Sequence, residues 1–259
     1  MPKVSVTIIT KNEEADITAA IGSVRWADEV IVVDSHSTDR TVEVAAAAGA
    51  RVIVRDWPGY IAQKNFAASA ASNDWILSLD ADERVTPALA SQITQALEQP
   101  AHAAFQMRRM NWHLGRWMTG TDWYPDYQVR LYDRRAAEWS GHLVHEGLAV
   151  RGTTGRLSAD LEHYAYRDIA DHLETINRYT TLAARQMYEA GRRASVWQLL
   201  LHGPLAFLRN YVLKGGWRLG TAGIIVSGMN AYYVFLKFAK LWQLQTPLGH
   251  GPRDGQESA

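Results

Sequence analysis

Two aspartates, Asp80 and Asp82, stand one residue apart where the apolar run WILSL, residues 75–79, ends. Carboxylates are the hard oxygen ligands that Mg²⁺ and Mn²⁺ prefer in proteins. The spacing alone is weak evidence, because the 15 aspartates of this chain should form about one such pair by chance. What the pair does therefore depends on what the fold brings to the same place.

Polar residues also follow two earlier apolar runs. KVSVTIIT, residues 3–10, and EVIVVD, residues 29–34, are typical of buried parallel strands. In parallel sheets, ligands bind beyond the carboxyl ends of the strands. We therefore expect one site at the rim of a sheet, formed by the residues that end these strands: Thr10, Asn12, Glu13, Asp34, Asp80 and Asp82.

Strand and helix patterns alternate through the first hundred residues. Strands are expected at 3–10, 29–34, 51–54 and 75–79, and helices after Asn12, which serves as an N-cap, and over 60–71 and 87–97. This alternation predicts βαβ units, and hence an α/β fold with a mostly parallel sheet. Residues 101–150 predict less regular strands, joined by the aromatic loop GRWMTGTDWYPD, which suits a mobile lid or an acceptor wall.

The net charge of the chain is zero, but the basic and acidic residues are unevenly distributed along it. Residues 190–253 hold eight basic residues, nine aromatic residues and no acid, whereas residues 1–189 hold 19 basic and 25 acidic residues. We expect three parts: a domain over 1–170, a helical membrane-associated region over 171–246 and a disordered tail over 247–259.

The basic and aromatic segment is suited to an anionic membrane surface. Its stretch 221–236 is uncharged for 16 residues, fewer than the roughly 20 that span a bilayer, so peripheral docking is expected. An ordinary helical cap is the alternative. Nucleic acid is not expected as a partner, because the basic residues are sparse and the rest of the chain is acidic.

Several chemistries are disfavoured by what the chain lacks. No G-x-G-x-x-G follows the first strand, and neither a P-loop nor a G-x-S-x-G elbow occurs. The absence of cysteine excludes disulfides and thiolate metal sites, and it fits a reducing, cytoplasmic compartment. Acids placed where a diphosphate would bind require a divalent cation between them.

Four segments together resemble the family 2 glycosyltransferases, which have the GT-A fold: VSVTIITKNEE, VIVVDSHSTDRT, QKNFAASAASNDWILSLDADE and VHE. More narrowly, the chain is similar to bacterial enzymes that add glucose to the lipopolysaccharide inner core. The resemblance implies an inverting transfer that depends on Mg²⁺ or Mn²⁺ and uses a UDP-sugar, UDP-glucose above all. It also implies a lipid-linked saccharide acceptor, heptose, at the inner face of the cytoplasmic membrane.

The resemblance also implies roles for single residues. Thr10, Asn12 and Glu13 would lie beside the nucleoside, and Asp34 would accept a hydrogen bond from the uracil ring. Asp80 would contact ribose or metal, Asp82 would bind the metal, and Gln63 or Lys64 would approach the base or the phosphates. One departure is that Ser35 follows Asp34, where many relatives have a second acid.

The catalytic base remains open between two acids. An inverting transfer needs a carboxylate that takes the proton of the acceptor hydroxyl. Relatives carry it about 60 residues or more after the acid pair, and Glu146 stands 64 residues after Asp82. Asp126 is the rival, or orients the acceptor. His145 would bind metal or phosphate, or pack locally, and Arg130 would pair with a phosphate or with Asp126, or form an internal ion pair.

Three alternative functions differ in what they require of the sequence. A transferase acting on a polyprenyl phosphate would need the same donor site and the same lipid-facing segment. A nucleotidyltransferase would ordinarily bring a glycine-rich phosphate loop. A non-catalytic membrane-bound partner protein would not need acids at the strand ends.

Overall fold

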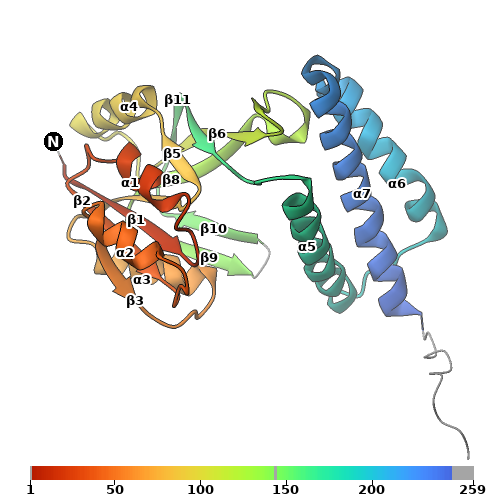
Figure 1. Ribbon diagram of the computed structural model, residues 1–259, viewed down its shortest axis with the longest axis horizontal. Coiled ribbons are helices and arrows are strands. Elements are labelled where there is room, and N and C mark those ends of the chain that lie inside the picture. The colour runs from red at the N-terminus through yellow and green to blue at the C-terminus, as the bar shows by residue number, and fades with distance from the viewer. Residues whose placement is uncertain (1, 143–144, 247–259) are drawn as a thin grey trace, which may run out of the picture. The chain divides into compact units, whose positions relative to one another are not determined.

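The computed structural model describes residues 2–142 and 145–246, except for the side chains of His142, His145 and Glu146. The predicted tail, 247–259, lies outside the described residues. The chain forms two compact units, which divide between Arg167 and Asp168 (Figure 1). Each unit has its own interior and is described by itself.

The first unit is built on a nine-stranded sheet whose main path runs β3-β2-β1-β4-β8-β6-β11-β5, with β7 paired to β6. Strands β3, β2, β1, β4, β6 and β11 share one direction, and β8 and β5 run against their neighbours. The predicted mostly parallel α/β sheet is therefore confirmed. The strands are β1 (Val4–Thr10), β2 (Glu29–Asp34), β3 (Arg51–Val54), β4 (Trp75–Asp80), β5 (Glu83–Val85), β6 (Ala104–His113), β7 (Arg116–Trp117), β8 (Asp126–Asp133) and β11 (Thr154–His163).

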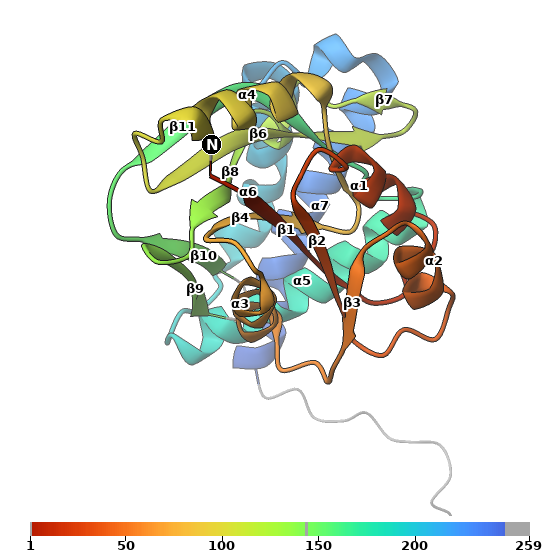
Figure 2. The same cartoon turned by 90° about the vertical axis from the view of Figure 1, so that its left-hand side faces the viewer.

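Helices cover both faces of this sheet (Figure 2). They are α1 (Ile17–Ser23), α2 (Thr41–Ala47), α3 (Tyr60–Ala70) and α4 (Pro87–Glu98), with a 3₁₀ turn at Thr121–Trp123 and a separate hairpin of β9 (Ala137–His142) and β10 (His145–Val150). Thr86 caps α4 by accepting from the Leu89 amide at 3.2 Å, and Pro87 fills the first helical position, where its missing N–H costs nothing.

The expected cap at Asn12 is wrong. Helix α1 begins at Ile17, and Asn12 adopts a left-handed backbone with φ of +57°. Asn and Asp tolerate this region because their short polar side chains can bond locally. The segment between Asn12 and α1 therefore forms a loop at the rim of the sheet.

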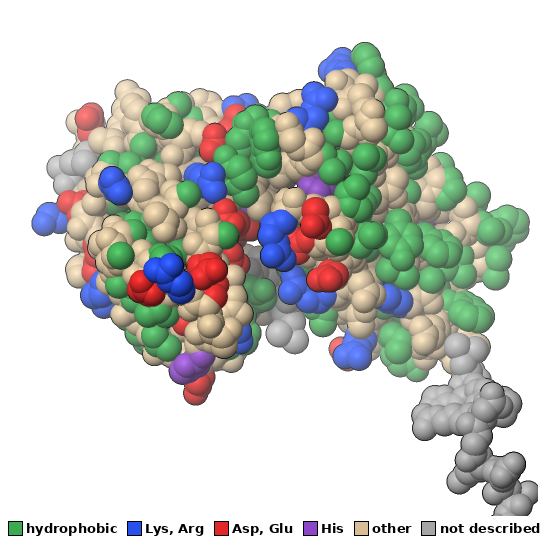
Figure 3. Space-filling view, in the orientation of Figure 1, with side chains coloured by type: hydrophobic (Ala, Val, Ile, Leu, Met, Phe, Trp, Pro, Cys, Tyr) green, Lys and Arg blue, Asp and Glu red, His purple; other side chains and the backbone are tan. Residues whose placement is uncertain are grey.

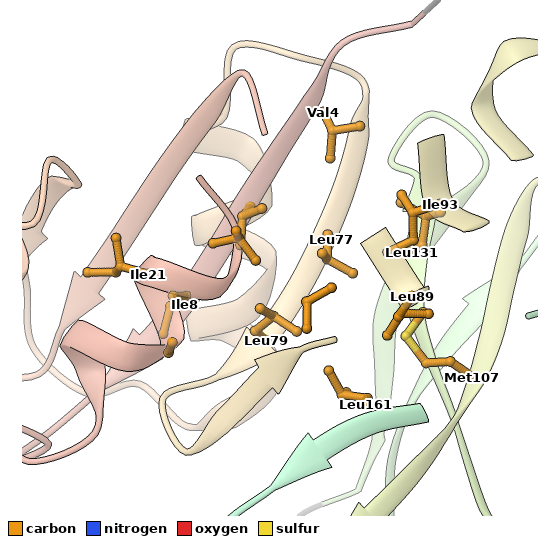
Figure 4. Close-up of a cluster of buried hydrophobic side chains, with 14 of the residues drawn as sticks. Val4, Ile8, Ile21, Leu77, Leu79, Leu89, Ile93, Met107, Leu131 and Leu161 are labelled. Atoms are coloured by element: carbon orange, nitrogen blue, oxygen red, sulfur yellow. The ribbon is translucent and has the colours of Figure 1, made fainter. Parts of the chain in front are cut away.

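The core has two layers because successive side chains of a strand point to opposite faces. Val4, Val6 and Ile8 face the layer shared with α1 and α4 (Figure 4), whereas Ile9 faces the layer shared with α3 and β9. All seven residues of β1 are buried. Both faces of the central strand are therefore buried, and six of its seven residues are β-branched, which suits such a position.

The second unit is helical, as predicted, with α5 (Ile169–Glu189), α6 (Val196–Leu208), short turns at Arg209–Leu213 and Gly216–Leu219, and α7 (Gly220–Gln245). Helix α7 packs against both α5 and α6. Within the described residues, one segment, 216–245, is long and apolar enough to cross a membrane by length and composition alone.

Candidate active site at the carboxyl ends of the strands

Strand register brings the predicted rim residues together. Thr10 pairs with Asp34, and Asp80 lies beside Ile9 on the other side of β1. Since β8 runs antiparallel to β4, its first residues come to the same edge. Farther along the sheet, Asn111 pairs with His163, and His163 pairs with Glu83. Polar residues from seven strands therefore share one rim.

The loops that follow β1 and β2 are joined by hydrogen bonds. The Asn12 amide donates to Ser37 Oγ at 2.8 Å, and the Thr38 amide donates to Asn12 Oδ1 at the same distance. The Glu13 amide donates to Thr41 Oγ1 at 2.7 Å. Asn12 and Glu13 are thus held in place by the second loop before any ligand arrives.

Asp34 is fully buried, and both of its carboxylate oxygens accept from Ser37, from the amide at 2.8 Å and from the hydroxyl at 2.5 Å. The side chain braces its own turn. Gln63 on α3 donates to Ser35 Oγ at 3.1 Å. Gln63 Oε1 and Thr10 Oγ1 are buried with no hydrogen-bond partner among the described residues.

Asp80 lies between two buried cations. Its carboxylate is 2.5 Å from Arg130 Nη2 and 3.4 Å from Lys64 Nζ, and Lys64 also lies 4.4 Å from the Trp139 ring centre. Burial by itself raises the pKa of Asp80, but the charges of Arg130 and Lys64 outweigh it and hold that pKa well below its ordinary value. Asp80 is therefore ionised, and its charge is already balanced by the protein.

Glu83, which follows the acid pair, is the structural partner of this group. It has no exposed side-chain surface, accepts from Arg130, and also accepts from the Asp80 amide at 3.1 Å. A buried carboxylate needs such partners, since an unpaired buried charge is very costly. Of the alternatives for Arg130, the internal ion pair is the one observed, with Asp80 and Glu83 and not with Asp126.

Asp82 has a different environment. Its Oδ2 lies 3.2 Å from His163 Nε2, and His163 Nδ1 lies 2.5 Å from Asn111 Oδ1. Asp82 Oδ1 has no hydrogen-bond partner in the part of the chain that the structure describes. Sequence reasoning missed His163, because it stands 81 residues after Asp82 and only the pairing of β11 with β5 and β6 brings it to the rim.

Several acidic side chains lie together at this end of the rim. The pKa of Glu13 is raised to about 7, first by burial and then by the charges of Asp82, Asp16 and Asp39, with Arg167 opposing them. Among the described side chains, no group of three or more His, Asp or Glu is arranged as a metal site. The excess acid beside Asp82 nevertheless has the chemistry that attracts a divalent cation.

The two candidates for the base differ in what the structure says of them. Asp126 is held by Arg109, whose Nη2 lies 2.8 Å from Oδ2, and by Gln128, which donates to Oδ1 at 2.8 Å. The backbone of Glu146 lies in β10, opposite Gly141. The side chains of Glu146 and His145 lie outside the described residues, so their roles stay predictions.

An aromatic wall, Trp112, Trp117 and Tyr164, adjoins the acid pair. The ring centres of Trp112 and Trp117 are 5.0 Å apart, and Tyr164 lies 5.6 Å from Trp117. The Tyr164 amide donates to the Asp82 carbonyl at 2.9 Å, and Arg84 stacks 3.8 Å above the Tyr164 ring. All three aromatic side chains are half-buried.

Comparisons with known proteins agree on one family. The model of glycosyl transferase family 2 matches residues 5–150. The chain is 33% identical over 257 residues to an uncharacterized glycosyltransferase of Rickettsia typhi, covering 94% of this chain and 88% of that one. It is 32% identical over 247 residues to the lipopolysaccharide core biosynthesis glycosyltransferase LpsC of Rhizobium meliloti, covering 92% of each chain.

Among solved structures, similarity extends to glucosyl-3-phosphoglycerate synthase of Mycobacterium tuberculosis in complex with Mn²⁺, uridine diphosphate and phosphoglyceric acid. That match has a TM-score of 0.49 and 19% identity, and it covers 75% of this chain and 80% of that one.

Proposed function

Because the chain belongs to glycosyl transferase family 2, we propose that its rim is the donor site of an inverting, metal-dependent hexosyltransferase that uses UDP-glucose. The observation that carries the proposal is the division of charge along the rim. Asp80 is paired with buried Lys64 and Arg130, whereas Asp82 has His163 as its ion-pair partner, and Glu13 lies among other acids whose charges help to raise its pKa. A nucleoside diphosphate bound with a divalent cation complements such a surface.

The nucleoside end of the donor would lie beside β1 and β2. Gln63 Oε1 and Thr10 Oγ1 are buried polar atoms without partners, which ordinarily costs free energy. A ring N–H of the uracil base would satisfy one of them. Asp34 would then act by bracing the turn that holds Asn12 and Ser35, beside its predicted contact with the base.

The cation would be held by Asp82, through its unpartnered oxygen, and by His163. When bound, a divalent cation neutralises the departing diphosphate. The charge pairs of Asp80 favour a ribose contact for this residue over direct metal binding. Lys64, 3.4 Å from Asp80, would add positive charge on the side of the phosphates.

At the acceptor, Glu146 would take the hydroxyl proton as the oxygen forms its bond to C1 of the sugar. The C1–O bond to UDP breaks on the opposite face, and its electron pair leaves with the diphosphate. The engagement of Asp126 with Arg109 and Gln128 supports an orienting role for Asp126. Half-buried Trp112 and Trp117 would offer flat apolar faces to a saccharide.

The acceptor class is supported by the similarity to LpsC over nearly the whole chain. A lipid-linked saccharide, heptose of the lipopolysaccharide core, is the acceptor that we propose. Transfer to it would take place at the cytoplasmic face of the membrane, where the basic segment 190–253 would meet an anionic surface.

The test is donor hydrolysis by the purified protein with Mn²⁺ and a panel of nucleotide sugars. We expect UDP-glucose to be hydrolysed fastest, chelation by EDTA to stop the reaction, and Asp82→Asn to lower it by about 10²-fold or more, as loss of a charge-stabilising group does. Asp74→Asn, which removes an acid paired with Arg134 outside the rim, is the matched control. Equal rates for Asp82→Asn and the control, or no hydrolysis of any sugar nucleotide, would overturn the proposal.

A further inference from the structure

Helix α6 has an apolar face that remains exposed among the described residues. No charged residue occurs from Val196 to Leu208. Trp197 is 71% exposed and Leu205 is 57% exposed, and the exposed face continues to Leu213, at 78%. In Figure 3 hydrophobic side chains gather on the surface of the second unit. The members of this outer face are Val196, Trp197, Leu200, Leu201, Leu205, Leu208, Val212 and Leu213.

The opposite face of α6 is already occupied. Leu199 packs into the small core of the unit, and Gly203 is buried. A Cβ at Gly203 would come within 3.3 Å of the Ala231 carbonyl of α7, which shows how closely the two helices approach. Rotating α6 to hide its outer face would therefore break this contact, so the outward orientation is set by the packing.

Helix α7 lies in the segment whose hydropathy would suit a membrane span, but it is hydrogen-bonded to the polar helix α5. Lys240 Nζ donates to Asn177 Oδ1 at 2.6 Å, to Thr181 Oγ1 at 2.7 Å and to Thr180 Oγ1 at 2.9 Å, all on α5. Helix α5 carries the exposed charges of Glu174, Arg178, Arg185 and Glu189. If α7 crossed a bilayer, these charges would have to enter the hydrocarbon, which is strongly unfavourable.

Charge at the two ends of α6 identifies the occupant. Arg192 and Arg193 precede the helix, and Arg209, Lys214 and Arg218 follow it, all exposed. No acid occurs from residue 190 to 253. A second copy docked on the same face would bring these cations together without partners. Anionic headgroups would pair with them, while the apolar side chains enter the acyl boundary.

We infer that α6 and the turn after it insert into the surface of an anionic bilayer and lie parallel to its plane, and that α7 does not span it. Trp197 and Trp217, 71% and 55% exposed, stand near the two ends of this face, at the positions where aromatic side chains anchor at headgroup depth. The inference goes beyond the proposed reaction, because it needs neither the sugar nor the acceptor to be correct.

The chain contains no cysteine, so one introduced cysteine can carry an environment-sensitive fluorophore on the full-length protein. We expect Leu201→Cys and Leu205→Cys labels to shift to the blue with vesicles of phosphatidylcholine and phosphatidylglycerol, and to be quenched by nitroxide lipids. Labels at Arg178→Cys and Arg185→Cys on α5 should not respond. Blue shifts on α5 as well, or none on α6, would overturn the inference.

A paired substitution tests the same face by affinity. Leu201→Glu with Leu205→Glu should lower partition into the anionic vesicles by about tenfold or more, with the circular dichroism spectrum unchanged. Leu173→Glu with Leu182→Glu, at exposed leucines of α5, is the matched control and should bind normally. Donor hydrolysis should survive in both variants, so its failure would count against the reaction and not against this surface. A blue shift at Leu205→Cys without vesicles, rising with protein concentration, would assign the face to a second copy and reject the bilayer.

Discussion

The two units of this chain place charge and apolar surface in opposite ways. Among the described residues, only four large apolar side chains are exposed in the first unit, against nineteen in the second. The first unit instead buries charge: Asp34, Lys64, Glu83 and Arg130 are all within its interior. Burying charge and exposing apolar surface are both unfavourable in water.

The difference teaches that each unit is adapted to a different neighbour. The buried charges of the first unit have partners within the protein, Lys64, Glu83 and Arg130 in ion pairs and Asp34 in hydrogen bonds from Ser37, and these groups converge on one rim, as expected where a polar ligand is bound. The apolar face of the second unit has no such internal partner, and it is flanked by cations. If the units are adapted separately, a substitution in one unit should leave the function of the other unit unchanged.

The largest effect should come from the proposed base in the first unit. Glu146→Gln should lower sugar transfer by about 10²- to 10⁴-fold, because the amide cannot accept the acceptor proton. Vesicle binding by the second unit should not change. Glu138→Gln, an exposed glutamate on the paired strand β9, is the control. If Asp126→Asn loses transfer and Glu146→Gln does not, the two acids exchange roles.

A large loss of stability is expected for Arg130→Met. The substitution removes the guanidinium that half-buried Asp80 and buried Glu83 both contact. Breaking such a buried pair costs about 3–5 kcal/mol in the free energy of unfolding. Urea unfolding at neutral pH measures it. Arg135→Met, which removes an exposed partner of Asp133, should cost much less, because exposed ion pairs contribute little. A similar loss of stability for both variants would contradict the larger contribution expected of the buried Asp80 network.

In the second unit, Lys240→Met should cost about 1–3 kcal/mol in the free energy of unfolding, because its ammonium serves several acceptors on α5 and hydrogen bonds of charged groups are stronger than neutral ones. Lys237→Met, whose ammonium lies 5.3 Å from the Phe238 ring, should cost less. Donor hydrolysis should be unchanged in both. If Lys240→Met has the same free energy of unfolding as the wild type, the hydrogen bonds of Lys240 do not stabilise the packing of α5 against α7.

The smallest effect concerns pH. The pKa of Glu13 rises from 4.5 unfolded to about 7 folded, so between these values the folded state binds more protons and stability falls as pH rises. Because Glu13 is partly exposed and screened, we expect Glu13→Gln to stabilise the protein by about 1–2 kcal/mol at pH 8. The gain should vanish as the pH falls below about 4.5, where wild-type Glu13 is protonated in both the folded and the unfolded state. Thermal unfolding across this range measures it, with Glu14→Gln as control, and a gain that does not depend on pH would contradict the assignment.

Much of the first unit could be predicted from local sequence. The apolar runs at β1, β2 and β4 identify central strands of a parallel sheet, and the residues that end them identify the rim. Pro87 after Thr86 marks the start of α4 to the residue. The GT-A-like fold and the transferase family are confirmed. These predictions succeeded because strand burial and helix starts depend on neighbours in the chain.

Other features depended on tertiary structure. Arg130 meets Asp80, Arg109 meets Asp126 and His163 meets Asp82 only because β8, β6 and β11 lie side by side in that order. Strand order is decided by long-range packing, which leaves no local pattern in the residues it brings together. Asn12 likewise reads as a helix cap, yet its contacts with Ser37 and Thr38 hold it in a loop.

By itself, then, the sequence determined the strands, the acid rim and a basic, aromatic and acid-free C-terminal segment. Only the tertiary structure decided that His163 joins Asp82, and which side of α6 faces outward. Helix α6 has no charged residue, and its two polar side chains, Gln198 and His202, lie on its half-buried side, so hydrophobic periodicity would not place the apolar face outward. The close approach permitted by Gly203 selects the face that packs on α7, and the other face is left for a neighbour outside the chain.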